Sequence, residues 1–218
     1  MNDTLVTFKK YPSQSYAKEI AALLNDNNIE TLLTDNIASF DATFSGNKLQ
    51  NEYEIKIKRT DFAIAASILE KSAENELSQV NPDHYLFQFT NEELYDILIA
   101  PDEWNEFDYK LAQKLLKERG KTINSEILAS LKVQRIKALS KPEENQKPWI
   151  IAGYFMAILG GFLGILIGYV LWTSKKTLPN GEQVYSYMEN DRVNGKVIFY
   201  IGIIIFPIAL LYKIFDKI

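Results

Sequence analysis

The 24 residues from Trp149 to Trp172, WIIAGYFMAILGGFLGILIGYVLW, contain no charged side chain. A helix needs about 20 apolar residues to cross roughly 30 Å of hydrocarbon, so this run is long enough to span a bilayer with some tilt. Trp149 and Trp172 lie at its ends, where amphipathic aromatic rings favour the headgroup region. The run therefore predicts a transmembrane helix over 149–172, with the two tryptophans as interface anchors.

Glycines are dense within this run. Gly160, Gly164 and Gly168 recur every four residues and therefore share one face of a helix. A phosphate-binding loop would need a preceding strand and a following Lys or Ser/Thr, and GGFLGILIG offers neither. In lipid, small residues let a second backbone approach closely. We expect this glycine face to pack against another helix; the alternative is a glycine hinge or a gap for a ligand.

A second apolar run, VIFYIGIIIFPIALLYKIF, covers 197–215, with Lys213 able to extend its amine to the interface. It predicts a second transmembrane helix, in which Pro207 introduces a kink and Gly202 lies opposite the glycine face of the first. The two spans predict a transmembrane hairpin, and the same glycine face offers a route to a homo-oligomer. In the connecting loop, 173–196, the Pro-Asn-Gly at 179–181 favours a tight β-hairpin.

The first third of the chain alternates strand and helix patterns. TLVTFKKY, IETLLT and YEIKIK read as strands, whereas the segments that begin at Ser13 and Asp61 carry apolar residues at helical spacing. The order strand, helix, strand, strand, helix over 1–73 predicts an α+β fold whose N-terminal domain is ferredoxin-like, βαββα(β). The bracketed fourth strand would come from HYLFQF, 84–89.

Within this domain, FKKYPSQSYA, AALLNDNNIETLLTDN and YEIKIKRTDFAIAASILE resemble a family of small bacterial domains described as signal-transducing proteins. The resemblance extends to about Lys71, a third of the chain. It implies a fold related to that of nitrogen-regulatory signalling proteins. The family brings no established chemistry, so the resemblance implies no ligand-binding or catalytic residue.

The segment 84–141 predicts a helical module that is acidic first and basic afterwards. Ten carboxylates and no Lys or Arg lie in 72–109, whereas nine Lys or Arg and two Glu lie in 110–141. Thr90 and Glu93 form a capping box, Pro101 starts a second helix that Gly120 ends, and Asn124 or Ser125 caps a third. EELYDILIAPDEWNEFDYKLAQKLLKERG is similar to a helical segment of two-span membrane proteins of Bacteroidetes-type bacteria. A linker, 142–148, leads to the apolar runs.

The sequence carries no motif of a catalytic, cofactor or metal site. It has no cysteine, which excludes disulfides and thiolate ligands. We expect a structural role for His84, the single histidine. The acidic residues lack EF-hand spacing, so we expect a solvated surface rather than a cation site; they are Glu92, Glu93, Asp96, Asp102, Glu103 and Glu106. The net charge of -4 and the acidic polar region argue against a nucleic-acid partner.

These features predict a non-enzymatic, membrane-anchored sensor or adaptor that presents a cytoplasmic ferredoxin-like domain to a protein or a small effector. The alternative is a structural or assembly subunit of a larger membrane complex, docked through its hairpin. Membrane lipid is the expected partner, and the basic half of the helical module either rests on anionic lipid or is solvated. Because no secretory signal precedes the polar region, we expect the inner membrane and two cytoplasmic termini.

Overall fold

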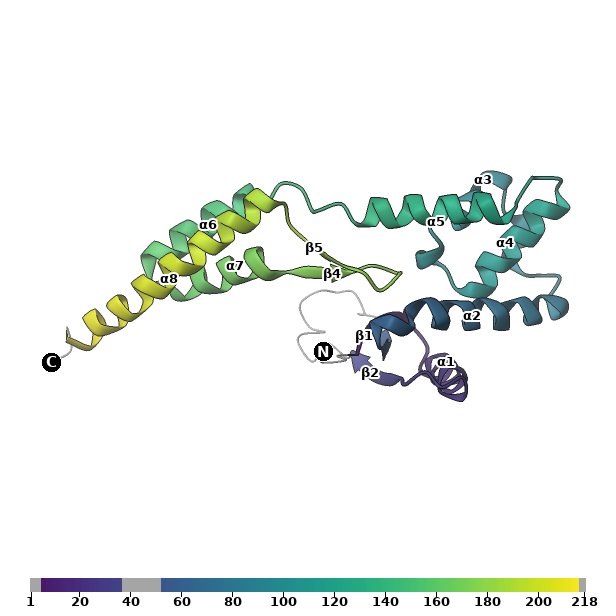
Figure 1. Ribbon diagram of the computed structural model, residues 1–218, viewed down its shortest axis with the longest axis horizontal. Helices are drawn as coiled ribbons and strands as arrows, with labels where there is room; N and C mark the ends of the chain where they lie inside the picture. The colour runs from purple at the N-terminus through teal and green to yellow at the C-terminus, as the bar shows by residue number, and fades with distance from the viewer. Residues whose placement is uncertain (1–4, 37–51, 216–218) are drawn as a thin grey trace. The chain divides into compact units, whose positions relative to one another are not determined.

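The computed structural model describes residues 5–36 and 52–215, and it has an α+β fold that divides into two compact units (Figure 1). The first unit comprises Met1–Leu139 with the short segment Thr177–Glu182. The second comprises Ser140–Lys176 and Gln183–Ile218. The first unit holds the larger sheet and five of the helices, and the second holds the apolar helices.

The sheet of the first unit has three described strands, β1 (Val6–Tyr11), β2 (Leu32–Asn36) and β3 (Glu52–Ile57). Their order is β1-β3-β2, and β3 is antiparallel to both neighbours. Helix α1 (Gln14–Asp26) joins β1 to β2, and α2 (Phe62–Glu76) follows β3 after the short 3-10 turn η1 (Arg59–Asp61). Apolar side chains of both helices and of β3 form one buried core; the fully buried members include Leu24, Ile55, Ile57, Phe62 and Ala65.

Helix α1 forms as its sequence predicts. The side chain of Ser13 accepts a hydrogen bond from the backbone of Tyr16, which caps the first turn. The four residues at helical spacing are buried; they are Ala17, Ile20, Ala21 and Leu24. The helix ends where Asn28 takes a φ of 63°, and the N–H of Ile29 then returns to the carbonyl of Leu24.

The predicted fourth strand is wrong. Residues Tyr85–Gln88 form the 3-10 helix η3. Three contacts favour this turn over an extended strand: Leu86 is completely buried, its N–H donates to Nδ1 of His84, and the hydroxyl of Tyr85 donates to Asp108. The alternating pattern of HYLFQF resembles that of a strand, but contacts of its side chains with the helical module decide its conformation instead.

The helical module contains α3 (Asn91–Ile99), α4 (Glu106–Glu118) and α5 (Ser125–Leu139), with 3-10 turns η2 (Leu77–Gln79) and η4 (Pro101–Glu103). The capping box of Thr90 and Glu93 is confirmed. Pro101 starts η4 rather than the long helix, which begins at Glu106 because the side chain of Asn105 accepts from the N–H of Asp108. The side chains of the module's core are almost completely buried; they include Leu86, Leu94, Ile97, Leu98, Leu111 and Leu116.

The predicted transmembrane helix over 149–172 is wrong as a single helix. The run forms two short helices, α6 (Lys147–Leu159) and α7 (Phe162–Thr173), separated at Gly160 and Gly161. Gly161 has a φ of +81°, a left-handed conformation that glycine adopts without strain. The chain reverses there, so that α7 packs back against α6 and a Cβ at Gly164 would lie 2.4 Å from Cα of Ala157.

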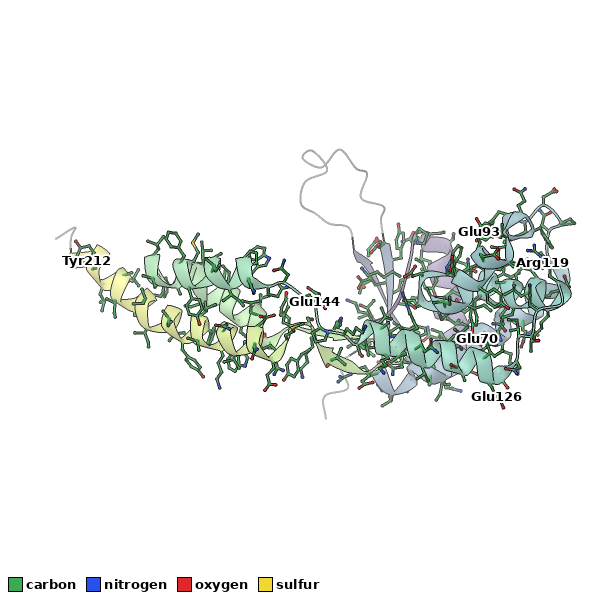
Figure 2. The ribbon with its side chains drawn as sticks, turned by 90° about the horizontal axis from the view of Figure 1, so that it is seen from above. Glu70, Glu93, Arg119, Glu126, Glu144 and Tyr212 are labelled. Atoms are coloured by element: carbon green, nitrogen blue, oxygen red, sulfur yellow. The ribbon has the colours of Figure 1, made fainter. Side chains whose placement is uncertain are left out.

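The third helix of this unit is α8 (Glu189–Phe215), which contains Pro207. Within residues 5–36 and 52–215, it supplies the one helix that is long and apolar enough to cross a membrane, Glu189–Tyr212. Figure 2 shows Glu144, which precedes α6, and Tyr212, near the end of α8, at opposite ends of the second unit. The predicted hairpin in the loop is confirmed: β4 (Lys175–Thr177) pairs with β5 (Gln183–Tyr185), and Gly181 takes a positive φ in its turn.

Candidate functional site

The first unit contains a cavity of about 1100 Å³. Its lining comes from β1, the start of α1, α2, η4, the start of α4, α5 and the turn 177–180. Six aromatic residues are part of this lining; they are Phe8, Tyr11, Tyr16, Phe62, Trp104 and Tyr109. Leu178, buried at the tip of the β-hairpin, completes one side. A cavity of this size with aromatic walls and a few polar groups is typical of small-molecule sites.

Two buried hydroxyl groups in the cavity lining lack a hydrogen-bond partner among the described residues. They belong to Tyr11 and Tyr109, whose side chains are almost completely buried. Burial raises the pKa of both phenols, that of Tyr109 to about 12, so each remains a neutral donor and acceptor near neutral pH. An unsatisfied buried hydroxyl costs about 1–3 kcal/mol and is uncommon in folded proteins. Both hydroxyl oxygens are closed to solvent, so they lie behind the cavity wall rather than on its surface.

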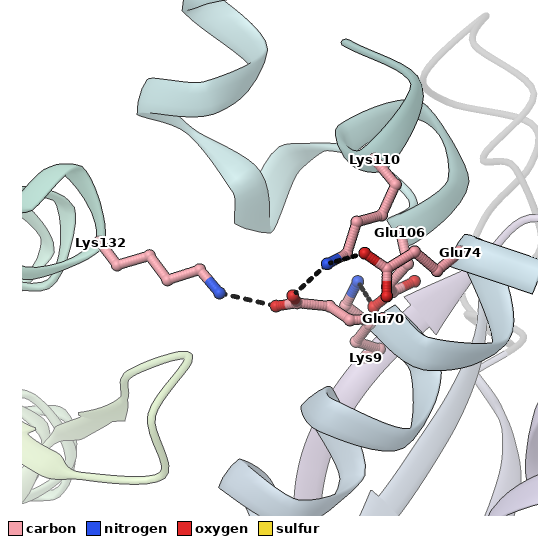
Figure 3. Close-up of polar contacts among 6 residues, drawn as sticks. All are labelled: Lys9, Glu70, Glu74, Glu106, Lys110 and Lys132. Atoms are coloured by element: carbon pink, nitrogen blue, oxygen red, sulfur yellow. Dashed lines mark hydrogen bonds and ion pairs between the residues drawn. The ribbon is translucent and has the colours of Figure 1, made fainter. Parts of the chain in front are cut away.

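Glu70 of α2 is the centre of a charged network beside the cavity (Figure 3). One carboxylate oxygen accepts from Lys132 of α5 at 2.6 Å, and the other lies 3.1 Å from Nζ of Lys110 of α4. Burial alone would raise the pKa of Glu70, but the hydrogen bonds and charges of the two lysines outweigh burial and lower it. The network therefore ties α2 to α4 and α5 of the module. Glu74 adds a second, 3.5 Å contact to Lys110.

Three further ion pairs lie in the same region. Lys9 of β1 is paired with Glu106 at the start of α4. Arg135 of α5 holds Asp102 with two hydrogen bonds of 2.7 Å and reaches Glu103 at 2.6 Å. Burial opposes ionisation of Asp102, but the hydrogen bonds from Arg135 prevail and lower its pKa. The charged side chains that line the cavity therefore form ion pairs around an aromatic interior.

The acidic residues singled out in the sequence are separated by the structure. Glu92 and Asp96 project from α3 into solvent, and Glu93 serves as the capping residue of that helix. Asp102 and Glu103 bind Arg135, and Glu106 binds Lys9. Over 5–36 and 52–215 no cluster of three or more His, Asp or Glu side chains has the geometry of a metal site.

His84 lies against the helical module. Its Nε2 is 3.5 Å from a carboxylate oxygen of Asp108, and its ring stacks on that of Tyr85. Asp108 is nearly fully buried and accepts hydrogen bonds from the hydroxyl of Tyr85 at 2.5 Å and from the amide of Asn105 at 2.7 Å. This buried polar cluster joins η3 to α4. Sequence reasoning missed Asp108, because nothing local distinguishes it from the nine other carboxylates of its segment.

The four glycines predicted to pack between helices have different surroundings. Gly164 faces α6, where its added Cβ would meet Ala157. Gly168 and Gly202 face the interface of α7 with α8: a Cβ at Gly168 would lie 2.5 Å from the backbone nitrogen of Phe199, and one at Gly202 would lie 2.7 Å from Ile165. Gly160 has nothing within 4 Å of a Cβ position. Helices of the same chain therefore cover Gly164, Gly168 and Gly202 but not Gly160.

The two tryptophans predicted as interface anchors belong to the same helical pair. Trp149 lies in the first turn of α6 and is 60% exposed. Trp172 lies in the last turn of α7, where its ring is 5.7 Å from that of Phe199 and 5.6 Å from Nζ of Lys196. Both therefore lie at the ends of α6 and α7 that are remote from the glycine turn.

The Glu70 network predicts a loss of stability in acid. Because the pKa of Glu70 is lowered in the folded state, its contribution is present above the pKa of an unfolded glutamate and is lost as pH falls through the folded value. Glu70→Gln should lower the stability of the first unit by about 1 kcal/mol at pH 7 and flatten its pH dependence below pH 5. Thermal unfolding of the full chain from pH 7 to pH 3 measures both effects.

Glu126→Gln is the matched control for this experiment, because Glu126 is exposed in the first turn of α5 (Figure 2). Its unfolding curve should follow that of the unsubstituted chain at every pH. Equal acid sensitivity of the Glu70→Gln protein and the unsubstituted protein would show that the network does not hold these helices together.

No protein-family model, curated protein or solved structure matches the chain. The cavity, its paired charges and the apolar helices of the second unit are therefore the observations from which its function is argued.

Proposed function

We propose that this protein is a membrane-anchored, non-enzymatic sensor or adaptor that binds a small effector in the cavity of its first unit. The observation that carries the proposal is the cavity itself, about 1100 Å³ of aromatic-walled space in a unit continuous with an apolar helical anchor. Binding rather than chemistry is favoured because the charged groups at the cavity are engaged with one another, as in the pair of Arg135 with Asp102.

The lining favours an effector with an aromatic or aliphatic body and a hydrogen-bonding group. Rings of Phe8, Phe62 and Trp104 offer contact area, and aromatic pairs add about 0.5–1.5 kcal/mol beyond the area that they bury. Uncharged polar residues of the lining, such as Ser67 and Asn180, supply hydrogen-bonding groups for a polar atom of the ligand. Since the carboxylates and cations of the lining are paired, neither sign of ligand charge is strongly selected.

The second unit supplies the proposed anchor. The outward faces of its helices carry many large apolar side chains that water would solvate poorly; they include Ile151, Phe155, Leu163, Leu166, Ile204 and Leu211. Membrane lipid is the partner that covers such faces without specific contacts. We place the first unit on the cytoplasmic side of an inner membrane, in keeping with the bacterial family that its N-terminus resembles.

The topology of the sheet supports the proposed ferredoxin-like relationship. In a split βαβ unit, a third strand lies between the two strands that the first helix connects, antiparallel to both. The order β1-β3-β2, with α1 joining β1 to β2, has this arrangement. Residues of β1 and α2, two elements of this domain, form part of the cavity wall.

A second candidate function, a subunit of a larger membrane assembly, is favoured by the same outward faces. Phe155 on α6 and Leu163 on α7 are more than half exposed, and a neighbouring transmembrane helix would cover them as well as lipid does. A photoreactive amino acid at Phe155 separates the two cases in native membranes. Adducts with lipid alone favour the anchor, and a single stoichiometric protein adduct favours the assembly.

Effector binding is tested by a substitution that fills part of the cavity. Ala66 lies on the cavity face of α2, and Ala66→Trp would occupy part of the volume without removing a charged pair. Full-length protein purified in detergent should carry a defined small molecule, detected by mass spectrometry of a solvent extract. We expect its amount per protein to fall at least tenfold in the Ala66→Trp variant, a difference worth about 1.4 kcal/mol of binding.

Ala129→Trp provides the matched control, because Ala129 is exposed on α5 and lies outside the cavity lining. This variant should retain the small molecule in full. If no molecule is enriched on the unsubstituted protein over the Ala66→Trp protein, the effector-binding function is contradicted.

A further inference from the structure

The polar termini of the apolar helices gather at one end of the second unit. Residue 143, before α6, forms a parallel bridge with Tyr187, before α8, and its N–H donates to the carbonyl of Ser186 at 2.7 Å. The N–H of Ser186 donates in turn to the carbonyl of Ser174, after α7. The chain therefore enters α6, leaves α7 and enters α8 at the same end.

Further side-chain contacts reinforce this polar end. Nζ of Lys176 donates to the carbonyl of Lys141 at 2.7 Å, joining the segment after α7 to the segment before α6. One turn into the helices, the hydroxyl of Tyr154 donates to the amide oxygen of Asn194 at 3.0 Å. Arg192 stacks on the ring of Tyr185.

The opposite end of the α6–α7 pair is an apolar turn packed on α8. A Cβ at Gly161 would lie 2.5 Å from the backbone nitrogen of Phe206, and the rings of Phe162 and Phe206 are 5.8 Å apart. Backbone hydrogen bonds hold the turn: the N–H of Gly161 donates to the carbonyl of Met156, and the N–H of Ile165 donates to the carbonyl of Gly161. Irregular backbone at membrane depth is tolerated where protein buries it in this way.

Neither limb of this pair is long enough to cross a bilayer. With 13 and 12 residues at 1.5 Å each, α6 and α7 extend roughly 20 and 18 Å, against about 30 Å of hydrocarbon. The apolar part of α8 continues past the level of the turn, because Gly161 meets α8 at Phe206 and the helix runs on to Phe215.

We propose that α6 and α7 form a re-entrant hairpin that enters and leaves the membrane on one side, and that α8 is the only crossing helix among the described residues. This inference rests on the proposed membrane anchor and changes its topology. The loop 173–188 then lies on the cytoplasmic side with the first unit, and the C-terminal end of α8 lies on the opposite side. The first unit itself contains 177–182 of that loop.

The distribution of basic residues supports this topology over two spans. With a re-entrant hairpin, eight Lys or Arg near the membrane are cytoplasmic, and two, Lys213 and Lys217, lie at the far side. The eight are Arg135, Lys137, Lys141, Lys147, Lys175, Lys176, Arg192 and Lys196. A pair of full spans would divide the same residues six against four. Basic residues are strongly enriched on the cytoplasmic side of membrane proteins, which favours the eight-to-two arrangement.

The absence of cysteine from the sequence makes single-cysteine labelling a direct test. Asn75→Cys marks an exposed position of the first unit, Asn190→Cys an exposed position at the start of α8, and Lys217→Cys the C-terminal end. Each full-length variant is treated with a membrane-impermeant maleimide in intact cells and in inverted membrane vesicles. We expect positions 75 and 190 to react at least tenfold more in inverted vesicles, and position 217 to react at least tenfold more in intact cells.

Three other results would overturn the inference, and they differ from one another. Labelling of position 190 in intact cells, with position 217 reacting in vesicles, would establish two full spans. Reaction of all three positions in vesicles alone would show that α8 does not cross. Release of the protein by alkaline carbonate would contradict the proposed anchor itself, whereas the first two results would leave the anchor intact.

Discussion

Gly164→Leu should disrupt the packing of α6 against α7 in the second unit. A Cβ at this position would lie 2.4 Å from Cα and 2.5 Å from Cβ of Ala157, so α6 and α7 would have to separate. Overpacking of an interior typically costs 1–3 kcal/mol, and a clash with backbone atoms places this variant at about 3 kcal/mol or above. Loss of the folded state in a detergent–denaturant titration, followed by tryptophan fluorescence, measures the effect.

Gly160→Leu is the matched control for that substitution, because nothing lies within 4 Å of a Cβ at Gly160. The added side chain is of the same size and hydrophobicity, only four residues away. We expect a change of less than about 0.5 kcal/mol. Equal resistance of the two variants to denaturant would contradict the packing of α6 against α7.

Asp108→Ala should destabilise the first unit by about 3 kcal/mol. The carboxylate of Asp108 is buried and accepts hydrogen bonds from the hydroxyl of Tyr85 and the amide of Asn105. The ring of His84 lies beside it. Truncation removes the hydrogen bonds that Tyr85 and Asn105 donate to a nearly buried carboxylate, and a hydrogen bond to a charged group contributes about 1.5–3 kcal/mol. The expected result is a clear fall in the thermal midpoint of the first unit, monitored by circular dichroism of the full chain.

Asp96→Ala separates this effect from a general loss of acidic charge. Asp96 is an exposed aspartate on the neighbouring helix α3, so its removal should change stability by less than about 0.5 kcal/mol. Asp108→Asn should fall between the two alanine variants, since an amide keeps one acceptor oxygen. A midpoint for Asp108→Ala within one degree of that for Asp96→Ala would show that the cluster does not stabilise η3 against α4.

Local signals predicted the elements whose conformation is decided locally. Ser13 and the apolar spacing of α1, and the Thr90–Glu93 capping box of α3, act within one or two helical turns, and both helices form where these signals place them. HYLFQF behaves differently: its alternation suits a strand, but Leu86 and Tyr85 find their partners in the helical module. A six-residue alternation carries no information about those distant partners.

The apolar run of 149–172 shows the same limit. Its uniformly apolar composition is compatible with one long helix or with two short ones, because its hydrophobic pattern is the same in both cases. The positive φ of Gly161 and the contacts of that residue with Phe206 decide between them, and Phe206 lies 45 positions later in the sequence. The alternative of a glycine hinge was available from the residues, but the partner that stabilises the hinge was not.

The candidate site was the least predictable part of the chain. Its aromatic residues come from β1, α1, α2, α4 and the segment before α4, and each is unremarkable in its own segment. Glu70 and Lys132 are 62 residues apart, and Asp102 and Arg135 are 33 apart. The acidic residues close together in sequence predicted a solvated surface, whereas the fold directs Asp102 and Glu106 to separate basic partners.

The close approach of α6, α7 and α8 also sets how this sequence can diverge. Gly161, Gly164 and Gly168 each lack room for one more carbon atom, and Gly195 and Gly202 face them or their neighbours from α8. A divergent sequence that keeps this helix packing must keep those five glycines. Position 160 and the outward aliphatic residues are free to vary. The spacing of these five glycines, rather than overall sequence identity, is the pattern that would identify distant homologues of this chain.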